Sequence, residues 1–276
     1  MEDERPKIGI ALGSGGARGL IHIGVLKVLE ENDIPIDFIA GASAGSIVGS
    51  YYALNKEIKS LNEKITQLTK KDLVKLIDIA SPKRALISGH KIEKFLKELI
   101  KDSSFSDLQI PLTIIATNMS TGKETHIREG KLIDAMRASI SLPGILPPAK
   151  IKDDLFLDGG IVNPTPVDVV KNMGADIVIG VDLTMNQPVR IENPSIVDTL
   201  RRSFEILRTR TTELNIGKTD DNTIIIKTNK AKIVDTYRFY DHEFITEGEK
   251  TAKKYLPKIK EAIRNWEEKR GDNDEI

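Results

Sequence analysis

Short apolar runs alternate with segments of helical spacing along the first part of the chain. Residues 7–13 (KIGIALG) are almost continuously apolar, as in a buried strand, and residues 17–32 repeat apolar side chains at helical intervals. A second apolar run at 37–41 leads directly into a helical pattern over 44–55. This strand–helix–strand–helix order predicts an α/β fold with a mostly parallel sheet that is covered on both faces.

The alternation is interrupted once and then resumes. Residues 56–101 have helical spacing without an intervening strand, whereas the prolines and the glycine of residues 141–148 (SLPGILPP) exclude regular structure. Further strands are expected at 111–119, 123–129, 150–160 (hairpin-like), 176–184 and 222–229, and further helices at 131–140, 166–173, 195–217 and 242–269.

Neither an internal repeat nor a long linker divides the 276 residues. We therefore expect a single domain over 1–276, with a motif-bearing core at about 7–185 and a helix–strand–helix extension at about 190–270.

Composition narrows the classes of function. Lys+Arg and Asp+Glu both number 41, so no net charge attracts the chain to nucleic acid. The absence of cysteine excludes disulfides and thiolate chemistry. No apolar stretch reaches the ~20 residues of a membrane span, and the charged N-terminus does not read as a signal peptide. We expect a cytoplasmic protein.

A serine stands between two glycines at the second predicted strand-to-helix junction, in Gly41-Ala42-Ser43-Ala44-Gly45. One interpretation is structural, because small residues let a helix pack closely on a sheet. The other is a nucleophile elbow, in which a sharp turn exposes the serine hydroxyl beside the amides of a helix N-terminus. Short matches of this kind also arise by chance, so the segment alone leaves both interpretations open.

A glycine-rich loop, residues 13–19 (GSGGARG), links the first predicted strand to its helix. Such loops leave backbone N–H groups free to bind an anion. A dinucleotide-binding loop fits poorly, because its third glycine would fall on Arg18 and the second strand lacks the closing acidic residue. Adjacent parallel strands end at the same edge, so the loop is expected beside Ser43, where its amides favour the oxyanion of acyl transfer.

A serine nucleophile needs a base, and the residues leave its identity open. Four histidines are present. His22 lies in an apolar helix, where a structural role is expected, whereas His90 lies at a helix start and His126 in a polar strand. Only His242 comes late enough in the chain for a Ser…Asp…His order. The alternative is Asp158, which begins an Asp-Gly-Gly turn. An aspartate has an ordinary pKa of ~3.9 and requires desolvation to act near neutral pH.

Taken together, these segments and their order resemble the patatin-like phospholipase family, particularly its short bacterial and archaeal members. The likeness covers roughly residues 7–185 and is weaker at 237–248. The matching segments are 15–19 (GGARG), 20–26 (LIHIGVL), 41–45 (GASAG), 138–143 (ASISLP) and 158–160 (DGG).

The resemblance implies a three-layer α/β/α sandwich that hydrolyses acyl esters, often of lipids, through a serine–aspartate dyad. It makes Ser43 the nucleophile, Asp158 the general base, and the amides of Gly15 and Gly16 the oxyanion hole. Ser14 departs from the family's first loop glycine. Supporting roles fall to Arg18, Gly41, Gly45, Gly159 and Gly160.

Several expectations accompany this assignment. No acidic cluster has calcium-loop spacing, so neither metal nor cofactor is expected. A catalytically inactive acyl- or phospholipid-binding scaffold and a transacylase are the alternative functions. Arg18 is expected to brace the glycine loop rather than to bind a lipid phosphate. The lysine-rich helical segment after the elbow suggests transient contact with a membrane surface. Part of it, at 70–90 with a Ser81-Pro82 break and a hinge at Gly89, is expected to cap an acyl pocket.

Overall fold

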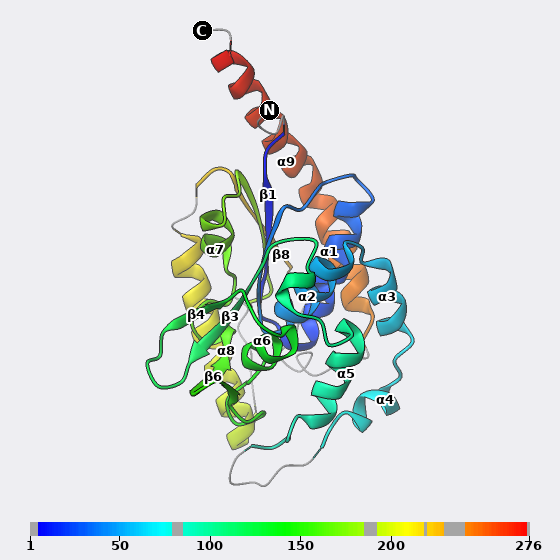
Figure 1. Ribbon diagram of the computed structural model, residues 1–276, viewed down its shortest axis with the longest axis vertical. Helices are drawn as coiled ribbons and strands as arrows, with labels where there is room; N and C mark the ends of the chain where they lie inside the picture. The colour runs from blue at the N-terminus through cyan, green and yellow to red at the C-terminus, as the bar shows by residue number, and fades with distance from the viewer. Residues whose placement is uncertain (1–4, 79–84, 185–191, 218–219, 229–240, 275–276) are drawn as a thin grey trace.

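A mixed eight-stranded sheet forms the centre of the molecule (Figure 1). The computed structural model describes residues 5–78, 85–184, 192–217, 220–228 and 241–274. The strand order is β5-β6-β3-β2-β1-β7-β8, with β4 paired to β3 off this path. The strands are β1 (Ile8–Leu12), β2 (Phe38–Ala42), β3 (Leu112–Asn118), β4 (Glu124–Ile127), β5 (Ala149–Ile151), β6 (Asp154–Asp158), β7 (Ile177–Asp182) and β8 (Thr223–Lys227).

The prediction of a mostly parallel sheet is confirmed. Strands β3, β2, β1, β7 and β8 run parallel, and only β4, β5 and β6 pair antiparallel. Every residue of the central strand β1 is buried, which explains its unbroken apolar run. In the register of β1 and β2, Leu12 lies opposite Gly41, so both strands end at the same edge. This register brings the glycine-rich loop next to Ser43.

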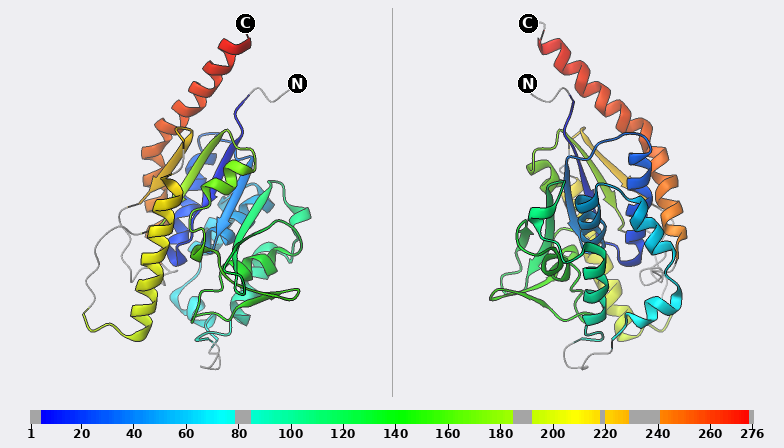
Figure 2. Two further views of the ribbon diagram at one scale, coloured as in Figure 1. Left: turned by 90° about the vertical axis from the view of Figure 1, so that its left-hand side faces the viewer. Right: turned by 45° about the vertical axis from the view of Figure 1, so that its right-hand side comes forward.

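Helices cover both faces of the sheet (Figure 2). One face packs on α1, α2, α5, α6 and α9 in the large apolar core, and the other packs on α7, with α8 beside α7. The three-layer α/β/α class is therefore confirmed. The helices are α1 (Leu20–Glu30), α2 (Ala44–Asn55), α3 (Lys59–Thr66), α4 (Lys70–Lys75), α5 (His90–Ile100), α6 (Leu132–Ser139), α7 (Val167–Asn172), α8 (Ile196–Ile216) and α9 (Glu243–Asp274), with single 3₁₀ turns η1 (Gly16–Gly19), η2 (Phe105–Asp107) and η3 (Gly159–Ile161).

The interruption of the alternation consists of α3, α4 and α5, which lie together at one side of the molecule (Figure 1). The Ser81-Pro82 break of the expected cap, and residues 237–240 of the late family-like stretch, lie outside the described residues. Gly89 is described and adopts a positive φ of 83° at the start of α5. Within the part of the chain that the structure describes, no helix combines the length and the apolar character needed to cross a membrane.

Candidate active site

Ser43 occupies a strained turn between β2 and α2. Its φ of 54° and ψ of −121° lie in a region that side-chain-bearing residues rarely adopt. The turn is so tight that a Cβ on Gly41 would lie 2.6 Å from the carbonyl oxygen of Gly45, and a Cβ on Gly45 would lie 1.9 Å from that of Leu12. The small residues around the serine are therefore required by the close approach of β1, β2 and α2. This geometry is that of a nucleophile elbow.

Asp158, the last residue of β6, accepts a hydrogen bond from the Ser43 hydroxyl. The distance between Ser43 Oγ and Asp158 Oδ2 is 2.7 Å, although 115 residues separate the two in the chain. The second carboxylate oxygen accepts the backbone N–H of Gly160 at 2.7 Å, and Gly159 begins the same 3₁₀ turn, η3. Ser43 is 8% exposed and Asp158 is 2% exposed. The two side chains thus form a nearly dry pair.

Burial sets the electrostatic character of this pair. Desolvation raises the pKa of Asp158 to about 6, against the lowering effects of the hydrogen bonds from Ser43 and Gly160 and of the Arg208 charge. A carboxylate with a pKa near 6 is ionised at neutral pH and is a stronger base than an ordinary aspartate. The arrangement can therefore accept a proton from Ser43 without a histidine.

The end of α6 holds both members of the pair in place. Ser139 Oγ accepts the backbone N–H of Ser43 at 2.8 Å, and the Ser141 carbonyl accepts the backbone N–H of Asp158 at 3.0 Å. The family-like block at 138–143 therefore lies against the site. Its role as a connector of Ser43 and Asp158 was not apparent from the sequence, because neither contact follows from spacing along the chain.

Among the described contacts, none of the four histidines bonds to Ser43 or Asp158. His22 is completely buried, its Nε2 lies 2.7 Å from the Gly13 carbonyl, and burial lowers its pKa to about 4. A neutral His22 thus donates to the glycine-rich loop, in keeping with the structural role expected for it. His242 lies just before α9.

The glycine-rich loop offers free backbone donors beside the elbow. Within the described part of the chain, the amides of Gly15 and Gly16 have no protein acceptor, whereas the Ser14 amide donates to the Pro164 carbonyl at 2.7 Å. Gly16 has a positive φ of 58°, which glycine adopts without strain. The Ser14 hydroxyl packs against Gly160, so this departure from the family pattern fills space beside Asp158 and leaves both free amides in place.

A buried cluster of three charged residues fixes the same loop. Arg18 Nη2 donates to Glu205 Oε1, which also accepts Arg208 Nη1 at 3.1 Å; Arg208 in turn donates to the carbonyl of Ser14. Arg18 Nε lies 3.4 Å from the carbonyl of Gly15. Each side chain is at most 3% exposed. These are the contacts expected if Arg18 braces the loop.

Glu205 and Arg208 were not found by sequence reasoning. They lie on α8, and 187 residues separate Glu205 from Arg18. Their spacing of three places both on one face of the helix, but a polar pair on a long helix is usually solvated. Only the packing of α8 against the loop reveals their connection to the site.

Comparisons with known proteins agree with this arrangement. The family model described as "Patatin-like phospholipase" matches residues 10–171, more than half of the chain. An uncharacterized NTE family protein of Mycobacterium tuberculosis is 33% identical over 193 residues, which cover 69% of this chain and 53% of that protein. Neuropathy target esterase sws of Drosophila melanogaster is 34% identical over 191 residues, covering 67% of this chain and 13% of that protein.

The solved structure of VipD from Legionella pneumophila has a similar fold. It superimposes with a TM-score of 0.54 at 13% sequence identity, over 93% of this chain and 67% of that chain. The chain spans about half the length of the mycobacterial relative. The elbow, the glycine-rich loop and the Asp-Gly-Gly turn are assembled at one edge of the sheet, and the family model matches most of that region. The chain therefore belongs to the patatin-like phospholipase family.

Proposed function

We propose that the protein is a serine hydrolase that cleaves carboxylic acyl esters of lipid-like substrates, of the phospholipase A or lysophospholipase type. The observation that carries the proposal is the 2.7 Å hydrogen bond from Ser43 Oγ to a buried aspartate of raised pKa, at a strained elbow. Membership of the patatin-like phospholipase family supports the same chemistry.

In the proposed reaction, Asp158 accepts the hydroxyl proton as Ser43 Oγ attacks the ester carbonyl carbon. Negative charge develops on the carbonyl oxygen, and the free amides of Gly15 and Gly16 stabilise it. Collapse of the tetrahedral intermediate breaks the ester bond, and Asp158 returns its proton to the departing alcohol. Asp158 then takes a proton from water, whose oxygen attacks the acyl-Ser43 ester. Collapse of this second intermediate breaks the bond between the acyl carbon and Ser43 Oγ, and Asp158 returns the proton to Oγ as the carboxylic acid leaves, which restores the free enzyme.

Exposed apolar side chains support a lipid-like substrate. Met119 follows β3 at the sheet edge where Ser43 follows β2, and its amide donates to the Leu155 carbonyl at 2.8 Å. The start of α8 and helix α4 lie toward the same end of the molecule (Figure 1). Such residues near a catalytic edge favour transient contact with a membrane or micelle surface. The exposed large apolar residues of these segments include Val74 of α4, Met119 and Leu155, and Ile196 and Leu200 of α8.

A covalent fluorophosphonate probe tests the proposal. The wild type should be labelled, Ser43→Ala should not, and Ser50→Ala, which removes a buried hydroxyl from the same helix, should still be labelled. Equal labelling of wild type and Ser43→Ala would refute the nucleophile. Lipid binding without labelling or turnover would favour the inactive scaffold. Formation of an acylglycerol in the presence of added glycerol would identify a transacylase.

A second pair of variants tests the base. Asp158→Asn should abolish turnover of a soluble ester while the protein stays folded, and His242→Ala should leave turnover unchanged. The opposite result would replace the dyad with a histidine-containing triad. A panel of short esters, long esters and phospholipids then defines the substrate class.

A further inference from the structure

A hollow lies at the end of the sheet opposite to Ser43. It has a volume of about 520 Å³ and is lined by Phe38, the first residue of β2, and by Leu112, the first residue of β3. Ser43 follows the last residue of β2, and a strand rise of about 3.3 Å per residue places the two ends of this five-residue strand about 13 Å apart. The hollow is therefore separate from the candidate active site.

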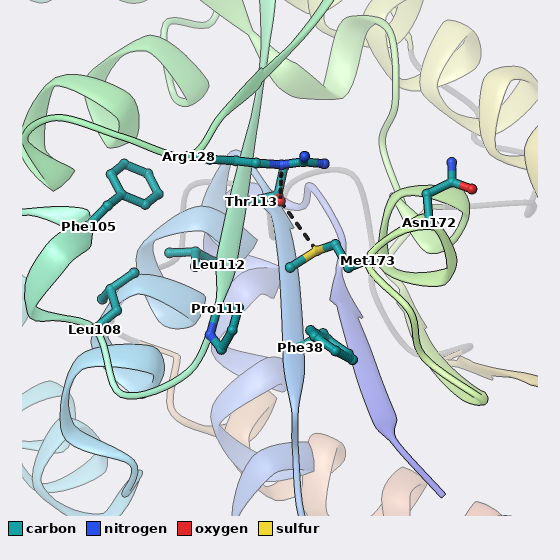
Figure 3. Close-up of a pocket in the computed structure, with 9 residues that line it drawn as sticks. All are labelled: Phe38, Phe105, Leu108, Pro111, Leu112, Thr113, Arg128, Asn172 and Met173. Atoms are coloured by element: carbon teal, nitrogen blue, oxygen red, sulfur yellow. Dashed lines mark hydrogen bonds between the residues drawn. The ribbon is translucent and has the colours of Figure 1, made fainter. Parts of the chain in front are cut away.

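Two apolar walls face each other across this hollow (Figure 3). Phe105 and Leu108, at η2, form one wall, and Phe38 and Met173 form the other. Leu112, on the strand between them, is 4% exposed. The volume of this hollow falls within the range of small-molecule sites, which typically measure roughly 300–1,000 Å³, and its lining combines apolar side chains with the polar Thr113, Arg128 and Asn172.

One cationic side chain crosses the top of the hollow. Arg128 follows β4, and its Nε donates to the hydroxyl of Thr113 at 2.9 Å; that hydroxyl donates in turn to the Met173 sulfur at 3.3 Å. Thr113 is completely buried, so the guanidinium is anchored from below (Figure 3). No carboxylate of the described residues forms an ion pair with Arg128. Its two terminal nitrogens are therefore available to an anion from solution.

We propose that this hollow binds an amphiphilic carboxylate, namely a fatty acid, with its head group on Arg128 and its chain between the apolar walls. A guanidinium presents a planar pair of donors that matches the two oxygens of a carboxylate. The walls contribute apolar surface on both sides, with a single positive charge at one end. The proposed hydrolysis releases an acid of this kind, but the argument for binding depends on the hollow alone.

Calorimetric titration with dodecanoate below its micellar concentration tests the inference. The Ser43→Ala protein is used, so that binding is measured without turnover and the result does not depend on the proposed activity. We expect one dodecanoate to bind per chain, and the binding to depend on Arg128. Arg128→Gln should bind at least about tenfold more weakly, and Arg128→Lys, which keeps the charge but loses the forked pair of donors, should have an intermediate affinity. Arg210→Gln, which removes an exposed arginine of α8, is the matched control and should bind like the parent.

Two further experiments separate the contribution of the hydrocarbon chain to binding from that of the head group. Leu108→Glu places a negative charge in one wall and should also weaken binding at least tenfold, with folding checked by circular dichroism. Dodecyltrimethylammonium, with the same chain and the opposite charge, should bind at least tenfold more weakly than dodecanoate. Absence of dodecanoate binding, equal affinity of the parent and Arg128→Gln, or equal affinity for the cationic amphiphile would overturn the inference.

Discussion

Replacing Asp158 by asparagine should inactivate the protein and stabilise it at the same time. The substitution preserves shape: the side-chain oxygen can still accept the Gly160 amide, and the new NH₂ group can donate to Ser43 Oγ. What it removes is a buried negative charge and the proton acceptor. Loss of a general base typically costs about 10²–10⁴ in rate.

The stability gain follows from the raised pKa of Asp158. Burial moves this pKa from 3.8 to about 6, a shift of about 2 pH units, and about 1.4 kcal/mol per unit gives about 3 kcal/mol. Because the native state holds its proton more tightly than the unfolded chain, stability falls as pH rises from about 4 to about 6 and stays lower above that window. Asp158→Asn should therefore raise the free energy of unfolding by up to about 3 kcal/mol at pH 7 and by little at pH 4.

Urea unfolding at pH 7 and pH 4, followed by circular dichroism, measures both numbers. The matched control is Asp154→Asn at the exposed start of the same strand, which should change stability by less than about 0.5 kcal/mol at pH 7. A destabilised Asp158→Asn protein, or an equal gain at both pH values, would refute the assignment of Asp158 as a desolvated, weakly acidic carboxyl.

Three further predictions concern the same site. The kcat/KM for a soluble ester should fall about tenfold per pH unit below pH 6 and level off above pH 7, because Asp158 must lose its proton to act as the base; a flat acid limb in a stopped assay would contradict this. Ser43→Gly should be more stable than Ser43→Ala by about 1 kcal/mol in urea unfolding, since only glycine tolerates the positive φ of the elbow; equal stabilities would remove the case for strain. Glu205→Gln should lower the free energy of unfolding by about 3–5 kcal/mol, because two buried arginines lose their partner, whereas Glu213→Gln on the surface of the same helix should cost less than about 0.5 kcal/mol. A small effect of the Glu205 substitution would show that water reaches this cluster.

Much of the sheet could be predicted because its strands are short and buried on both faces. In β1 the apolar run arises from covering helices on either side, so the pattern reports the packing directly. The strand order could not be predicted, since β6 joins β3 antiparallel through pairs such as Ala116 with Asp158 that no local pattern specifies. The single domain and the cap over 70–90 stay predictions.

The candidate site likewise has a part that local sequence patterns predict and a part that they do not. Ser43 and Asp158 lie in local sequence motifs, and the family resemblance implied that the two side chains act together; the structure places Ser43 Oγ 2.7 Å from Asp158 Oδ2. Ser139, Glu205 and Arg208 carry no such pattern. Their contacts depend on how α6 and α8 pack, and packing between distant segments is set by the whole core rather than by neighbouring residues.

The contacts that sequence reasoning missed explain how the fold accommodates a site whose own features are destabilising. A positive φ at Ser43, a buried carboxylate at Asp158 and a buried ion cluster around Glu205 each oppose folding, and such features persist only where surrounding structure holds them. Here the support comes from every layer. Strands β1 and β2 set the loop beside the elbow, the end of α6 and the segment after it bind the backbone of Ser43 and Asp158, and α8 fixes the carbonyl of Ser14. Because several of these contacts are made to backbone groups, they position the hydroxyl, the carboxylate and the free amides without engaging the Ser43 hydroxyl itself. We infer that the rigidity of the site comes from these distant segments, and that α8 belongs functionally to the catalytic core although it lies outside the segment matched by the family model.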